Sequence, residues 1–167
     1  MRTFLVLNCS QSMKIKVIET TCFIPAELTT VWTFFSNPAN LNAITPPELK
    51  FEILSDIENK EMHSGMIIRY NIRPLMNIPM SWTTEITHCH DHQFFVDEQR
   101  FGPYAFWHHQ HHFKAVEGGV EMTDIVHYAV GWGILGKIAS WVYVDRQLQH
   151  IFDFRNIEIK KIFPASK

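Results

Sequence analysis

The fold is decided by ILGKIASWVYVDRQLQHIFDFRNIEIKKIF, residues 134 to 163, a long stretch that contains no proline. Its large apolar residues recur at steps of three, four and seven, which is the spacing of one helical face. These residues are Ile134, Ile138, Trp141, Leu148, Phe152, Ile159 and Ile162. The stretch therefore predicts one long amphipathic helix that must bury its apolar face against a second layer.

Two charged residues, Asp145 and Arg155, fall on the same stripe as these apolar residues. They either lie at its edge, or Arg155 points into a cavity. A buried arginine needs a partner, because an unpaired buried charge is costly. Glu98 or Asp124 could be that partner, which would make Arg155 a structural latch or a clamp for an anionic ligand group.

The chain before this helix has mostly strand composition. Residues 14 to 24 read as a strand that ends at Pro25, and residues 26 to 37 have helical spacing. A second short helix is expected over residues 39 to 43, before Pro46 and Pro47. Turn residues then separate six strand-like runs, at 49 to 56, 66 to 72, 80 to 88, 94 to 101, 104 to 116 and 120 to 130. The prediction is an α+β fold with a seven-stranded antiparallel sheet.

This order of elements resembles the helix-grip fold of the START-like (SRPBCC) superfamily. Four stretches are similar to its bacterial polyketide cyclase/dehydrase and lipid-transport branch: FIPAELTTVWTFFSNPANLNAITPP at 23 to 47, FVDEQRFGPYAFWHHQHHF at 95 to 113, GGVEMTDIVHY at 118 to 128 and IFDFR at 151 to 155. The resemblance covers residues 14 to about 160. It implies a curved sheet wrapped around the C-terminal helix, with an apolar cavity between them for a small hydrophobic ligand. We expect residues 13 to 167 to form one START-like domain after a disordered extension, residues 1 to 12.

Composition narrows the partners and the location. The formal charge of −2 and the absence of a basic cluster argue against nucleic acid. Cys9, Cys22 and Cys89 show neither a disulfide framework nor a zinc spacing, which favours the cytoplasm. The apolar run from Phe4 to Leu7 is too short for an export signal, and we expect no stable membrane insertion.

The histidine cluster FWHHQHHF, residues 106 to 113, lies within a predicted strand, where side chains alternate between faces. Trp107, His109, His111 and Phe113 share the aromatic face, which is the predicted inner face. His108 and His112 share the other face, and we expect them to be exposed, as we do His88, His90 and His92. A turn at Gly118 and Gly119 would pair the inner residues with the next strand as follows: His111 with Val126, His109 with Tyr128 and Phe113 with Asp124.

Several interpretations of His109 and His111 remain open. A metal site would need a third ligand besides these histidines, and the spacing does not fix one, because Asp124, Glu98 and His127 are all possible. We therefore predict no metal and no cofactor. As catalytic groups, either could be the base of a polyketide cyclase or dehydratase, with Tyr128 or Glu98 as the acid. They could instead bind a ligand oxygen, or only form part of the wall.

The preferred prediction is a protein that binds a small hydrophobic or lipid-like molecule between the sheet and the helix, with no assigned catalytic residue. The predicted ligand-binding residues are Trp82, Glu98, Trp107, His109, His111, Phe113, Tyr128, Phe152 and Arg155. The facing of Glu85, Glu98 and Arg100 depends on whether a bulge occurs near Gly102 and Pro103. A third class, a cochaperone-like module, would use the convex surface and need no pocket.

Overall fold

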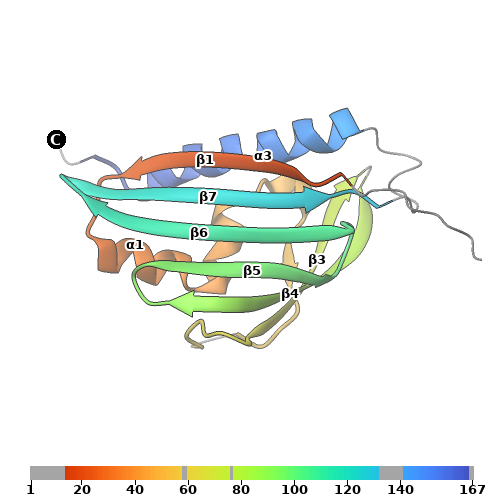
Figure 1. Cartoon of the computed structure of the whole chain (residues 1–167), viewed down its shortest axis with the longest axis horizontal. Helices are drawn as coiled ribbons and strands as arrows, with labels where there is room; N and C mark the ends of the chain where they lie inside the picture. Colours follow the sequence, from red (N-terminus) through yellow and green to blue (C-terminus); the bar gives the residue numbers. More distant parts are fainter. Residues whose placement is uncertain (1–13, 58–59, 76, 132–140, 166–167) are drawn as a thin grey trace, which may run out of the picture.

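The computed structural model describes residues 14–57, 60–75, 77–131 and 141–165. Seven strands form one antiparallel sheet in the order β1-β7-β6-β5-β4-β3-β2 (Figure 1). The strands are β1 (Lys16–Ile24), β2 (Glu52–Ile53), β3 (Ile67–Leu75), β4 (Ile78–His90), β5 (Phe94–Phe101), β6 (Phe106–Val116) and β7 (Gly119–Ala129). The helices are α1 (Leu28–Phe35), the 3-10 helices η1 (Pro38–Ile44) and η2 (Pro47–Leu49), and α3 (Trp141–Ile162). The predicted α+β helix-grip architecture is confirmed.

Two elements differ in kind or length from the sequence prediction. The second short helix is a 3-10 helix, which begins where the Asn37 side chain accepts a hydrogen bond from the Ala39 backbone N–H. The strand predicted at 49 to 56 is reduced to Glu52–Ile53, because η2 ends at Lys50 with a positive φ of 45°. The predicted extension, residues 1 to 12, and the predicted helix start, residues 134 to 140, lie outside the described residues.

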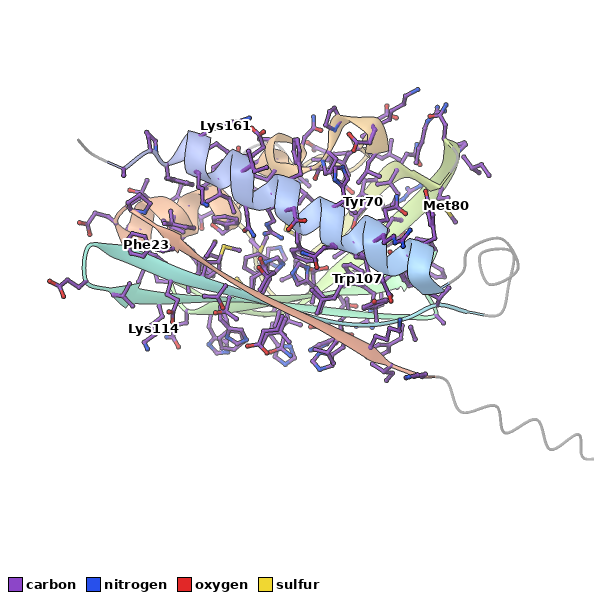
Figure 2. All side chains as sticks on the ribbon, turned by 90° about the horizontal axis from the view of Figure 1, so that it is seen from above. Phe23, Tyr70, Met80, Trp107, Lys114 and Lys161 are labelled. Carbon is purple, nitrogen blue, oxygen red and sulfur yellow. The ribbon has the colours of Figure 1, made fainter. Side chains whose placement is uncertain are left out.

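Helix α3 lies along one face of the sheet, the inner face, with Trp107 pointing toward it and Lys114 away from it (Figure 2). Its buried residues are Val144, Leu148, Phe152, Arg155 and Ile159, at steps of three and four. This stripe therefore covers the inner side chains of the strands beneath it. No helix in the described ranges is long and apolar enough to cross a membrane.

A polar contact joins α3 to two strands. The Tyr128 hydroxyl of β7 donates to Asp145 Oδ1 at 2.6 Å, and Lys16 of β1 pairs with Asp145 Oδ2. Burial alone would raise the pKa of Asp145, but Lys16 and the Tyr128 hydroxyl outweigh it and lower this pKa. Asp145 is therefore a charged anchor for the first turns of α3.

The β6–β7 turn differs from its prediction by one residue. The loop consists of Glu117 and Gly118, with Gly118 at a positive φ of 79°, so Val116 pairs with Gly119. The register is shifted by two residues, and His109 faces Val126 while His111 faces Asp124. A shift of two leaves every side chain on its predicted face.

Gly119 is the first residue of β7, and strand β1 passes close to it. A Cβ atom there would lie 2.2 Å from the Ile24 carbonyl oxygen. We expect Gly119→Ala to lower the free energy of unfolding by about 3 kcal/mol, since backbone atoms must move apart. Urea unfolding measures this loss. Gly118→Asn is the matched control, because asparagine tolerates a positive φ and the nearest atom to a Cβ there is 3.9 Å away. Equal losses in both variants would contradict the packing argument.

The Asp145 anchor predicts a pH-dependent contribution to stability. A carboxyl whose pKa is lowered by folding stabilises the protein above its unfolded pKa of about 4, and this stabilisation is lost as the pH falls further. The side chain is 39% exposed, so we expect Asp145→Asn to cost only about 0.5–1 kcal/mol at pH 7. The difference from the wild type should shrink below pH 4 in denaturant titrations. Asp153→Asn, on the exposed side of α3, controls for the loss of one charge.

Candidate functional site

A cavity of about 190 Å³ lies between the inner face of the sheet and α3. Most of its lining is apolar or aromatic, with side chains from η1, the central strands and α3. Charged and histidine side chains also reach it: Asp97, His109, His111 and Arg155. The cavity therefore combines a large apolar wall with one strongly polar region.

The two predicted faces of β6 are confirmed by burial. His109 and His111 are 6% and 5% exposed on the inner face, beside Phe113. His108 and His112 lie on the outer face but are half-buried, and both contact Gln110. His88 and His90 are exposed as expected, whereas His92 is half-buried and stacks on Trp32.

Asp97 connects the two inner histidines from one side. It lies opposite His109 in the β5–β6 ladder, so its side chain also points to the inner face. Its Oδ2 atom is 3.3 Å from His109 Nδ1 and 3.0 Å from His111 Nε2. Its Oδ1 atom accepts a hydrogen bond from Trp107 Nε1 at 3.3 Å. Every oxygen of this carboxylate thus has a nitrogen neighbour.

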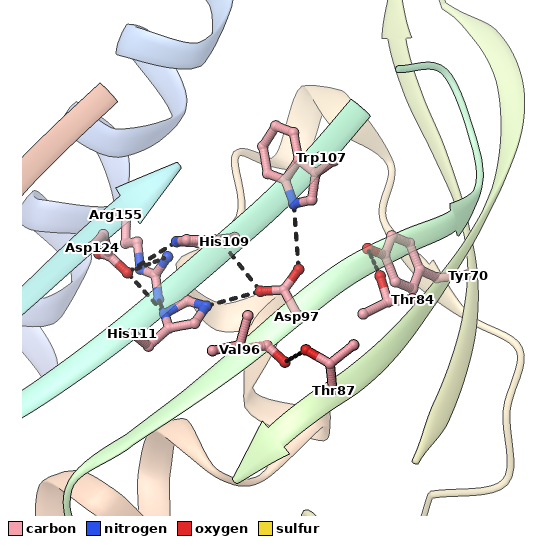
Figure 3. Close-up of polar contacts among 10 residues, drawn as sticks. All are labelled: Tyr70, Thr84, Thr87, Val96, Asp97, Trp107, His109, His111, Asp124 and Arg155. Atoms are coloured by element: carbon pink, nitrogen blue, oxygen red, sulfur yellow. Dashed lines mark hydrogen bonds and ion pairs between the residues drawn. The ribbon is translucent and has the colours of Figure 1, made fainter. Parts of the chain in front are cut away.

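Asp124 of β7 connects the same histidines from the other side (Figure 3). Its Oδ1 atom is 3.1 Å from His109 Nε2 and 2.8 Å from His111 Nδ1. Arg155 Nη1 of α3 is 3.6 Å from the same oxygen, and its guanidinium lies over the Phe35 ring. Two carboxylates and two imidazoles therefore form a closed ring of contacts, the histidine–aspartate ring, with Arg155 beside it.

The protonation of this ring follows from opposing effects. Burial alone would raise the pKa of Asp97 and Asp124, but the histidines, and for Asp124 first Arg155, hold both pKa values below their ordinary range. Burial alone would lower the pKa of His109, but the two carboxylates outweigh it and raise that pKa. Burial and the charge of His109 lower the pKa of His111. Burial and the neighbouring charges thus favour two charged carboxylates, and they favour protonation of His109 over protonation of His111.

The prediction of Glu98 as a ligand-binding or acid residue is wrong. Glu98 pairs with Glu85 and His108 in the ladders, and all three point to the outer face. There its carboxylate contacts Arg100 at 3.1 Å and His108 at 2.8 Å. Arg100 also contacts Glu85 at 2.5 Å. The bulge occurs at Arg100 itself, and the next inward carboxylate is Asp97.

Two further predicted residues lie on the inner side but do not line the cavity. Phe113 packs between Trp32 and Phe35, with ring centroids 5.5 Å from each. Tyr128 is 2% exposed, and its hydroxyl is bound to Asp145. Neither predicted acid, Tyr128 or Glu98, therefore reaches the cavity. The predicted residues that do line it are Trp82, Trp107, His109, His111, Phe152 and Arg155.

Asp97 is the important residue that sequence reasoning missed. The stretch Phe95-Val96-Asp97-Glu98 has no clear alternation, so its inward residue could not be chosen from periodicity alone. Two adjacent acids have opposite facing in a strand, so one of them had to face inward. Two buried histidines on the neighbouring strand need acceptors, and this requirement was the available signal.

Comparison with known proteins identifies the fold. No protein-family profile and no curated protein matches the chain. The protein Ms6760 of Mycobacterium smegmatis is similar, with 17% identity and a TM-score of 0.64 over 92% of this chain and 98% of that one. A START superfamily protein of the same organism has 12% identity and a TM-score of 0.62, over 87% and 98%. A norcoclaurine synthase of Thalictrum has 15% identity and a TM-score of 0.59, over 90% and 97%. The chain therefore has the helix-grip fold of the START-like superfamily.

The Arg155–Asp124 pair predicts a large effect on stability. Arg155→Met removes the positive charge beside a carboxylate that is 4% exposed. We expect a loss of about 3 kcal/mol, the lower end for a broken buried pair, because the histidines still contact Asp124. The double variant Asp124→Asn/Arg155→Met should lose less than the sum of the single losses in a denaturant double-mutant cycle. Arg146→Met, on the exposed side of α3, is the control, and an equal loss there would refute the pairing.

Proposed function

We propose that this protein binds a small, mostly apolar molecule that carries an oxygen acceptor, in the cavity between the sheet and α3. The observation that carries the proposal is a buried apolar cavity that contains unpartnered hydrogen-bond donors. We further propose a cytoplasmic location, which Cys22 and Cys89 support as free cysteines.

The size of the cavity limits the ligand. An apolar cavity of about 150 Å³ binds benzene. The cavity of about 190 Å³ suits a substituted single ring or a compound of similar size. Trp82 and Trp107 supply aromatic surface, with ring centroids 5.2 Å apart, and Phe152 supplies it from α3. A ligand of this kind gains most of its affinity from removing apolar surface from water.

Unpartnered donors favour an oxygen on that ligand. Among the described residues, Trp82 Nε1 and Arg155 Nε are buried nitrogen atoms without a hydrogen-bond partner, and both residues line the cavity. A buried donor without an acceptor costs about 1–3 kcal/mol. A ligand carbonyl or ether oxygen that accepts a hydrogen bond from one of these donors would recover part of this cost. The donors therefore favour a ligand that carries an oxygen acceptor.

Matched ligands test this selection directly. Acetophenone and isopropylbenzene have the same number of heavy atoms, but only acetophenone has an oxygen acceptor. We expect acetophenone to bind about fivefold more tightly, corresponding to one hydrogen bond of about 1 kcal/mol. The quenching of tryptophan fluorescence measures both dissociation constants. Trp82→Phe should reduce the preference, since it removes Nε1, one of the two donors, and keeps an aromatic ring.

Trp32→Phe is the matched control, because Trp32 is equally buried but does not line the cavity. It should keep the preference for acetophenone. Mass spectrometry of natively purified protein after organic extraction then identifies the natural ligand. No binding of either probe, together with an empty native protein, would reject the proposal. Binding without any preference would reject the role of the donors and keep the apolar cavity.

A further inference from the structure

The histidine–aspartate ring has fewer hydrogens than contacts. Each ring nitrogen of His109 and His111 faces a carboxylate oxygen, which makes four nitrogen–oxygen contacts between 2.8 and 3.3 Å. Two neutral imidazoles provide only two N–H groups. The two imidazole rings also lie close together, with their centroids 3.8 Å apart.

One tautomer of each histidine would leave a lone pair on the nitrogen that faces Asp97. In this tautomer the hydrogens lie on His109 Nε2 and His111 Nδ1, which are 3.1 and 2.8 Å from Asp124 Oδ1. His109 Nε2 already has a hydrogen bond to Asp124. His111 Nε2 has its hydrogen bond to Asp97 Oδ2, and Arg155 Nη2 donates to His111 Nδ1 at 3.4 Å, so the hydrogen of His111 would have to move to Nδ1. The lone pairs of His109 Nδ1 and His111 Nε2 would then both point toward Asp97 Oδ2.

We propose that these three atoms, Asp97 Oδ2, His109 Nδ1 and His111 Nε2, form a binding site for a divalent transition-metal ion. One ligand atom from each of the three residues lies within 4.8 Å of the other two. Two of their separations, 3.0 and 3.3 Å, are close to the value of about 3.3 Å that tetrahedral ligands 2.0–2.1 Å from zinc would have. One ion would take the place of the hydrogen at the contacts of Asp97 Oδ2 with both histidines. The proposal replaces the expectation that the protein binds no metal.

The surroundings supply the outer contacts that such a site needs. Metal-bound histidines donate their second N–H to a carboxylate or carbonyl, which fixes the tautomer and the ring orientation. Asp124 Oδ1 is in place to accept from both histidines. The non-ligating oxygen of Asp97 already accepts from Trp107 Nε1. Arg155 balances the charge of Asp124, so that Asp124 remains an acceptor instead of becoming a further ligand.

Three protein ligands leave at least one coordination position open. Asp97, His109 and His111 all line the cavity, so that position faces the space between the sheet and α3. Two histidines and one carboxylate with an open position suit Zn²⁺ and Fe²⁺. The metal ion alone would bind to the three atoms, so the metal site does not require the apolar ligand proposed above.

Zinc binding to the whole chain tests the site. The protein is first stripped with a chelator, and zinc is then titrated in competition with a chromophoric chelator, without any organic ligand. We expect one zinc per chain by elemental analysis. His109→Gln removes one of the three ligand atoms and should weaken binding at least a hundredfold. Asp124→Asn keeps all three ligands and loses the outer acceptor, so we expect a 10–100-fold loss.

The outer histidines of the same strand provide the matched control. The double variant His108→Gln/His112→Gln removes two imidazoles from the same strand that point to the outer face. It should change the zinc affinity by less than twofold. Circular dichroism verifies that each variant is folded. In the Co²⁺-loaded protein, the NMR signal of the Trp107 indole N–H should shift strongly while those of His88 remain in place.

Three results would overturn the metal site. They are less than about 0.1 zinc per chain at saturation, equal affinities of the wild type and a folded His109→Gln variant, and a loss that follows His108 and His112. None of these results bears on the preference for acetophenone. Failure of the metal site and failure of the ligand site are therefore distinguishable.

Discussion

The inner region of this fold depends on the burial of Asp124 together with Arg155. Arg155 is 6% exposed and Asp124 is 4% exposed, and each charge in this position is costly without the other. The pair connects the last helix to a central strand and fixes the rotation of α3 about its own axis. That rotation places Leu148 and Phe152 over the cavity. The apolar wall and the polar region are thus positioned by a single electrostatic requirement.

The same requirement explains why the cavity is polar in one place only. Asp124 contacts two histidines, and these in turn face Asp97, so the polar groups lie against one another within a small volume. Polar networks are tolerated in a core when their members are paired. Outside the network, the unpartnered Trp82 Nε1 and Arg155 Nε remain within the described part of the wall. The interior therefore separates a self-contained charged cluster from donors that are free to meet a ligand.

The fold could be predicted almost completely from sequence, because periodicity and turn residues report local structure. The spacing from Leu148 to Ile159 fixed the helix, and alternation at His109 and His111 fixed the faces of β6. Side-chain contacts across strands were less accessible. The β6–β7 register was shifted by two because Gly119 lies in the ladder, where β1 passes close to it, and is not part of the turn. This contact between strands cannot be read from the local sequence. Asp97 was missed because the residues around it do not alternate clearly, so that its facing is decided by its pairing with His109 across the ladder.

The adjacent acids of β5 have a consequence for how this strand tolerates change. Asp97 lies in the histidine–aspartate ring and Glu98 lies in the outer cluster with Arg100 and His108. A one-residue slip of β5 would exchange the two faces and bring Glu98 inside. A carboxylate would then still meet His109 and His111, although with one more methylene. The same slip would turn the buried Phe95 to the outer face, so the register of β5 is held by its apolar core residue and not by the acidity of its inner face.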